Sequence, residues 1–154
     1  MAASAADLFA RHHHDVYRYL VRMTGRRDVA DDLVQDVFLR VVRALGNGAP
    51  IGHERGWVFS IARSVLVDRQ RDRRRSVTVV NEATEPAKDG TQALALGLSQ
   101  SLARLADADR EVFLLKEVGG LSYQEIADIS GCTVEAVRSR LHRTRSALRS
   151  MLSI

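Results

Sequence analysis

The side chains best suited to molecular recognition lie in the stretch from Leu121 to Leu148. Its second half is rich in arginine and contains no carboxylate after Glu135. Arginine can donate paired hydrogen bonds to a guanine edge or to a phosphate, and serine can bond to either. Six side chains are spaced for such contacts: Arg138, Ser139, His142, Arg143, Arg145 and Arg149. These residue types predict recognition of DNA, although an arginine-rich helix end taken alone is more often a solvated surface.

A helix-turn-helix is predicted to hold these side chains. Ser122 has a glutamate three residues on, which is the spacing of a capping box and predicts a first helix over Tyr123–Ser130. Gly131 can take the left-handed conformation that ends a helix, and Thr133 can cap a second helix over 134–151. Apolar residues at helical spacing allow the two helices to pack together: Ile126, Ala127, Ile129, Val137 and Leu141. Together these features favour DNA binding over a bare basic helix.

Helical periodicity dominates the rest of the chain and strand alternation is nearly absent, so the sequence predicts an all-α protein. The expected helices cover 5–24, 29–45, 54–74, 93–105 and 107–118; Gly25 ends the first helix and Asp28 caps the second. Residues 76–92 are polar and lack a sustained period, which is typical of a linker. We therefore predict two small helical domains, residues 1–75 and 93–154, joined by a flexible linker over 76–92.

The predicted helix over 29–45 carries a line of polar side chains beside one apolar residue. Asp32, Gln35, Asp36 and Leu39 are three or four residues apart and therefore share one face. Carboxylates in the first turn of a helix are favourable in themselves, but Asp36 lies two turns in. The line is thus either a solvated face or a docking surface for a partner with a basic surface.

The predicted helix over 54–74 ends in a basic run from Arg69 to Arg75 that contains five arginines. Cations are favourable at the C-terminus of a helix, which accounts for part of this run. Five arginines exceed what capping requires, so the run, with Arg71 and Arg74 in it, is expected to bind phosphate.

A single tryptophan, Trp57, lies near the start of the same predicted helix. His53 and Arg55 precede it, and Asn47 belongs to a glycine-rich loop just before. A lone tryptophan is most often part of a core, and that is the favoured interpretation here. The same group of side chains could also receive an unstacked nucleic-acid base.

Composition narrows the class of protein. The 154 residues carry a formal charge of +4 and a pI of about 9.8, a moderate preference for a polyanionic partner. The single cysteine, Cys132, excludes an intrachain disulfide and suits a reducing compartment. No signal peptide or long apolar run is recognisable. We therefore expect a soluble cytoplasmic protein with no membrane segment of its own.

Metal binding and catalysis are both disfavoured. His12, His13 and His14 are consecutive, and consecutive residues of a helix point about 100° apart, so the three cannot all bind one ion. His53 or Cys132 could be considered as further ligands, but Cys132 lies far along the chain in a turn. No nucleophile–base pair or phosphate-binding loop is recognisable. The protein is not expected to be an enzyme, and neither a catalytic residue, a metal nor a cofactor is predicted.

Three blocks of the sequence, in the same order and spacing, resemble the sigma-70 family of RNA polymerase initiation factors, in its compact extracytoplasmic-function (ECF) group. The blocks are DVADDLVQDVFLRVVRAL (28–45), WVFSIARSVLVDRQRDRRR (57–75) and REVFLLKEVGGLSYQEIADISGCTVEAVRSRLHRTRSALR (110–149). The resemblance implies a factor that binds core RNA polymerase through its β′ and β subunits and directs it to promoter DNA. It also implies control by an anti-sigma factor that covers both domains.

The resemblance further implies a role for particular residues. The helix with Asp32, Gln35, Asp36 and Leu39 corresponds to the part that docks on the β′ coiled coil. Recognition and opening of the −10 element would fall to Asn47, Arg55, Trp57, Arg63, Ser64, Arg71 and Arg74. Recognition of the −35 element would fall to Arg138, Ser139, His142, Arg143 and Arg145.

The chain departs from the family pattern at two places, and two other functions stay open. Ser64 follows Ala62-Arg63 where the family commonly has asparagine, and Glu135-Ala136 stands where many members have Gly-Thr. One alternative is a helical regulator that binds duplex DNA directly, as a dimer and without polymerase. The other is an interaction protein whose apolar helix faces bind another helix bundle.

Overall fold

The computed structural model describes residues 3–49, 51–75 and 90–152, and within these ranges it contains seven helices and no strand. The all-α prediction is therefore confirmed. The chain divides into two compact units, 1–82 and 83–154, and each is described by itself. None of the helices in the described ranges combines the length and the apolar character needed to cross a membrane. Of the predicted linker 76–92, residues 76–89 lie outside the described part.

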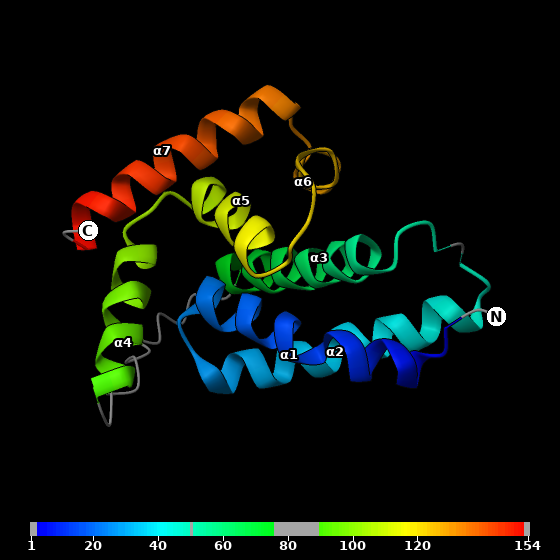
Figure 1. Cartoon of the computed structure of the whole chain (residues 1–154). Coiled ribbons are helices and arrows are strands. Elements are labelled where there is room, and N and C mark those ends of the chain that lie inside the picture. Colours follow the sequence, from blue (N-terminus) through cyan, green and yellow to red (C-terminus); the bar gives the residue numbers. More distant parts are fainter. Residues whose placement is uncertain (1–2, 50, 76–89, 153–154) are drawn as a thin grey trace. The chain divides into compact units, whose positions relative to one another are not determined.

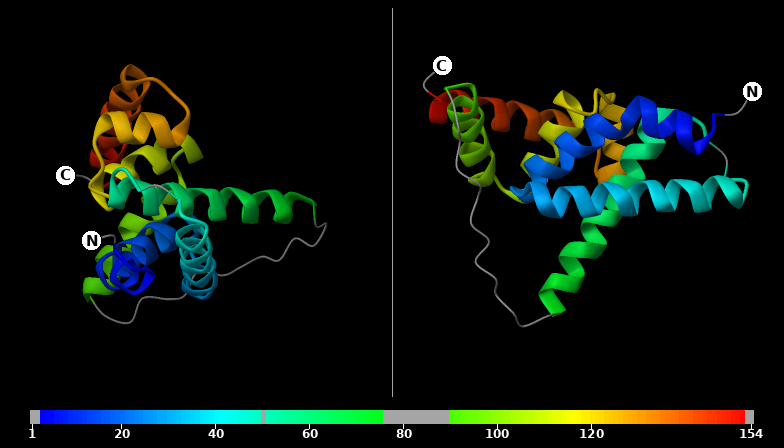
Figure 2. Two further views of the ribbon diagram at one scale, coloured as in Figure 1. Left: turned by 90° about the vertical axis from the view of Figure 1, so that its right-hand side faces the viewer. Right: turned by 90° about the horizontal axis from the view of Figure 1, so that it is seen from below.

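The first unit consists of α1 (Ala5–Thr24), α2 (Arg27–Gly46) and α3 (Glu54–Arg75). The helices α1 and α2 lie side by side, and α3 crosses the pair (Figures 1 and 2). Its core is formed by aliphatic side chains of all three helices around an edge-on pair of rings, Tyr19 and Phe59, whose centroids are 5.7 Å apart. Both rings are fully buried, and they connect α1 to the N-terminal part of α3.

The ends of α1 and α2 test the expected caps. Gly25 has φ 75° and ends α1, as predicted. The prediction for Asp28 is wrong: α2 begins at Arg27, and its N-cap residue Arg26 makes no side-chain cap. The carboxylate of Asp28 instead accepts hydrogen bonds from the guanidinium of Arg26, one of them 2.9 Å long from Nε. A neighbouring cation thus takes the oxygen that a cap would have offered to a backbone N–H.

The second unit consists of α4 (Gly90–Ala103), α5 (Asp107–Glu117), α6 (Tyr123–Ser130) and α7 (Val134–Leu152). The first three all pack against the long α7 (Figure 1). The side chain of Arg110 closes the C-terminal end of α4, since its Nε donates to the carbonyl of Leu102 (2.9 Å) and its Nη2 to that of Leu105 (3.0 Å). Helix α4 begins three residues before the expected start and ends two before the expected end.

The predicted helix-turn-helix is present as α6 and α7. Ser122 and Glu125 form the capping box in both directions, with the Ser122 hydroxyl accepting from the Glu125 amide at 3.1 Å. Gly131 has φ 68° and ends α6. The Thr133 hydroxyl accepts from the amide of Ala136 at 3.1 Å and caps α7. These contacts fix where α7 starts and therefore which of its side chains face outwards.

Candidate nucleic-acid and partner-binding surfaces

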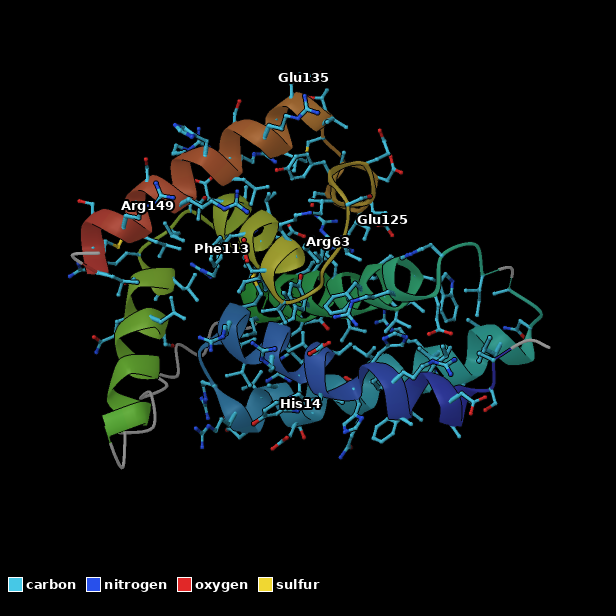
Figure 3. All side chains as sticks on the ribbon, in the orientation of Figure 1. His14, Arg63, Phe113, Glu125, Glu135 and Arg149 are labelled. Carbon is cyan, nitrogen blue, oxygen red and sulfur yellow. The ribbon has the colours of Figure 1, made fainter. Side chains whose placement is uncertain are left out.

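Helix α7 has one buried side and one open side. Val137, Leu141, Thr144 and Leu148 recur at three- and four-residue intervals and are buried against the other helices of the unit. The opposite side exposes residues of mostly polar and basic type: Glu135, Arg138, Ser139, His142, Arg143, Ser146 and Arg149. Figure 3 labels Glu135 and Arg149 near the two ends of this side. Ser146 was missed by the sequence analysis, although helical spacing from Ser139 and His142 would have found it.

Two of the predicted DNA-contacting arginines have acidic partners on α5. Arg143 donates from Nε to Oδ2 of Asp109 (3.2 Å) and from Nη2 to Oδ1 (2.7 Å). These hydrogen bonds raise the pKa of the Arg143 guanidinium above its already high ordinary value. Arg145 donates from Nη2 to Oε1 of Glu117 at 2.8 Å. The partners are 34 and 28 residues apart in the chain, so no local pattern could have predicted them.

An aromatic ring of α6 contributes to the same surface. The Cζ atom of Arg138 lies 5.7 Å from the centroid of the Tyr123 ring, and Nζ of Lys116 lies 4.9 Å from it. Cations within about 6 Å of an aromatic face are attracted to it. Both cations therefore lie within attractive distance of the Tyr123 ring, and Arg138 belongs to the second turn of α7.

The start of α3 is tied to α1 by a group of charged side chains. Glu54 accepts from Arg11 at 2.7 Å and lies 2.5 Å from Nε2 of the buried His12. The hydrogen bonds from Arg11 and then His12 lower the pKa of the Glu54 carboxyl to about 2. Next to it, Arg55 donates to Asp15 at 2.6 Å. The predicted −10 residue Arg55 is thus half-buried in an ion pair, with its guanidinium 5.4 Å from the Phe59 ring.

The other predicted −10 residues lie on or just before α3. Trp57 is half-buried rather than fully enclosed, because the buried side of α3 is formed by Val58, Phe59, Ala62, Val65 and Leu66. Asn47, in the loop before the helix, is exposed. Along α3, Arg63 is half-buried, whereas Ser64, Arg71 and Arg74 are exposed. Ser64 accepts a hydrogen bond of 3.2 Å from Arg40 of α2, which also pairs with Asp68 at 2.8 Å.

The line of polar residues predicted on α2 is on the surface. Asp32, Gln35, Asp36 and Leu39 are all exposed, and Leu39 keeps 53% of its surface open. Large apolar side chains are rarely left this open without a reason when they lie together. Val42, one turn further on, is 54% exposed as well. We call the set Asp32, Gln35, Asp36 and Leu39 the docking face.

The histidines of α1 do not form a metal site within the described residues, where no group of three or more histidine, cysteine or acidic side chains could hold an ion. The ring of His12 meets Glu54, whereas the ring of His13 bonds to the carbonyl of Phe9 at 2.7 Å and stacks on the Phe9 ring. His14, labelled in Figure 3, is exposed. Each of the three side chains has a different environment, as helical geometry requires.

Comparison with known families and structures gives a consistent result. The family described as sigma-70 region 2 matches residues 8–76, and the family described as sigma-70, region 4 matches residues 96–148. CarQ of Myxococcus xanthus, an RNA polymerase sigma factor, is 33% identical over 95% of this chain and 87% of CarQ. The ECF RNA polymerase sigma factor SigE of Mycolicibacterium smegmatis is 34% identical over 96% of this chain. The chain spans 61% of the length of SigE.

Two solved structures are similar over most of the chain. The sigma factor RpoE of Bartonella quintana, solved in complex with the anti-sigma factor NepR, is 25% identical with a TM-score of 0.81 and covers 95% of this chain and 94% of its own. CnrH, solved in complex with the cytosolic domain of CnrY, is 26% identical with a TM-score of 0.75 and covers 97% and 87%. The ranges matched by the two family models contain the first two sequence blocks, the third block up to residue 148, and the exposed line on α2. They also contain α6 and most of α7. This chain belongs to the sigma-70 family of transcription initiation factors, in the ECF group.

Proposed function

We propose that this chain binds core RNA polymerase, through the β′ and β subunits, and directs it to promoters with defined −35 and −10 elements. The observation that carries the proposal is the presence, on one chain, of an exposed acidic and apolar face on α2 and an exposed arginine-rich face on the second helix of a helix-turn-helix. A protein that only bound DNA would not need the first of these. The proposal places the protein in the cytoplasm, where core polymerase is found.

Docking is assigned to the docking face. The carboxylates of Asp32 and Asp36 and the half-exposed side chain of Leu39 suit a partner surface with basic side chains around an apolar centre. The resemblance identifies this partner as the β′ coiled coil. The apolar part would contribute affinity by burial, and the carboxylates would contribute register and association rate. Both contributions need side chains that are open in the free chain, and all four are.

Promoter recognition is divided between the two units. The −35 element is assigned to Arg138, Ser139, His142, Arg143 and Arg145 of α7, of which Arg138 is held near Tyr123. Opening of the −10 element is assigned to α3 and the loop before it. There the half-buried ring of Trp57 offers a stacking surface for an unpaired base, and the exposed Arg71 and Arg74 offer charge for phosphates. Arg55, Arg63, Ser64 and Asn47 complete this assignment.

An anti-sigma factor is proposed as the controlling partner. The support is that two structurally similar proteins, RpoE and CnrH, were solved bound to such regulators or to a domain of one. The exposed apolar side chains Phe9, Leu39 and Val42 would be covered by such a partner in the same way that polymerase would cover the docking face.

The decisive experiment is run-off transcription with purified core RNA polymerase, with and without this chain, on a pool of promoter fragments. New transcripts with defined start sites are expected, and alignment of their upstream sequences would give both elements. If no transcript appears but the chain alone shifts duplex DNA, the chain is a direct regulator. If there are neither transcripts nor a shift, the role of the chain is limited to protein binding.

A further inference from the structure

The carboxylate of Asp109 is unusual because it is buried but belongs to the first turn of a surface helix. Only 9% of the residue is exposed. It lies in the first turn of α5, where the backbone N–H groups at the helix N-terminus are oriented towards negative charge. The partner that compensates it is Arg143, which approaches from α7 with two hydrogen bonds. A buried carboxylate that lost this partner would be strongly destabilising, so the pair is expected to persist when α7 binds a ligand.

The pair holds only one edge of the guanidinium. Arg143 gives its Nε–H and one Nη2–H to Asp109, and a guanidinium has five N–H donors. Three donors therefore remain for a further acceptor. The side chain is 62% exposed, so these donors are accessible on the same open side as Ser139 and His142. An arginine that is already fixed in one orientation loses less conformational freedom on binding than a free one.

We propose that Asp109 is a positioning residue for −35 recognition, which orients Arg143 so that its open edge meets a base edge of the promoter. This inference rests on the proposed function and adds to it a residue that lies outside α7. It accounts for a contact that capping and core packing do not require, since the same helix pair is already held by apolar side chains such as Val112 and Leu141. Asp109 itself does not touch DNA in this proposal.

The neighbouring pair Glu117–Arg145 provides a matched control. It joins the same two helices at 2.8 Å, but through a single hydrogen bond and with 46% of the Glu117 side chain and 39% of the Arg145 side chain exposed. Ion pairs this open to water are weak and screened by salt. Glu117 therefore does not hold its arginine in one orientation, and its loss should not alter which bases are preferred.

The test is run-off transcription by core polymerase with the full chain, on a promoter library randomised at the −35 element. Asp109→Asn keeps the size of the side chain and removes its charge. We expect Asp109→Asn to reduce discrimination about 10-fold at the positions where Arg143→Ala does so, because a well-oriented arginine–base contact discriminates by that order. In the Arg143→Ala background, Asp109→Asn should cause no further change in preference. Glu117→Gln should leave the base preference unchanged.

Several results would overturn the inference. If Asp109→Asn lowered transcription equally from all library members, the carboxylate would be structural only. If Arg143→Ala left the base preference unchanged, there would be no arginine contact to orient. Arg143→Lys separates folding from orientation, because it keeps the charge opposite Asp109 but loses the fork; it should fold and show the altered preference. If wild-type chain gave no transcripts at all, the proposed function itself would fail, which is distinguishable from every other result.

Discussion

Leu39 allows the docking assignment to be tested with a magnitude taken from the structure. Covering a leucine side chain completely contributes about 1.5–3 kcal/mol. Since 53% of Leu39 is open in the free chain, a partner that covers the remainder gains about 1–1.5 kcal/mol from it. Leu39→Ala should therefore weaken binding to core polymerase roughly 5- to 12-fold. The stability of the free chain should change by no more than about 1 kcal/mol, as is usual for surface positions.

Val42→Ala tests how far this contact extends along α2. Val42 is as exposed as Leu39, at 54%, and follows it by one turn on the same side of the helix. Affinity would be measured by anisotropy of the labelled chain titrated with core polymerase, and stability by urea unfolding. We expect both variants to weaken core binding, because both side chains are open in the free chain and share this side of α2. Wild-type affinity for Leu39→Ala would refute the reasoning that this line of residues meets polymerase.

Three further predictions follow from the surfaces and the charged group on α3. Changing Asp32 and Asp36 together to lysine should reduce core binding more than 100-fold with unchanged melting, because like charges would then face each other; retained pull-down would contradict it. Changing Arg71 and Arg74 to alanine should reduce the salt slope of promoter binding by about 1.4–1.8; an unchanged slope would assign both to helix capping. The lowered pKa of Glu54 stabilises the fold above about pH 4.5 and less as the pH falls towards 2. Glu54→Gln should therefore lose less stability than the wild type between pH 5 and 3. Unfolding would be followed by Trp57 fluorescence, and parallel curves of stability against pH for the two proteins would contradict the prediction.

The helix-turn-helix was predictable because its determinants are local. A capping box, a left-handed glycine and a capping threonine act over three or four residues, and all three are found where the sequence predicted them. The same logic failed at Asp28, where a competing local partner, Arg26, was present. Local rules identify which groups could pair but not which of two candidates succeeds.

The pairing of the arginines could not be predicted, because it depends on how distant helices meet. Arg55 finds Asp15 at a separation of 40 residues, and Arg143 finds Asp109 at 34. From the sequence, both arginines were equal members of a DNA-contacting set. In the fold, Arg55 is enclosed in an ion pair on the α1 side of α3, whereas Arg143 keeps most of its side chain open. The assignment of these residues to DNA contacts therefore stays a prediction. The structure adds which of the arginines already form ion pairs within the chain.

These pairs also bear on whether the chain binds DNA by itself. Non-specific affinity for a duplex grows with the number of phosphates that free cations can neutralise. On α7, the charge of Arg143 is compensated by the buried carboxylate of Asp109 on α5, which leaves fewer uncompensated cations on this surface than the sequence suggests. Such a surface favours discrimination between DNA sequences over non-specific affinity for a duplex. On the proposed function, a second attachment through polymerase raises the affinity for a promoter, and the exposed docking face on α2 is suited to provide it. This argues against a regulator that acts on duplex DNA alone.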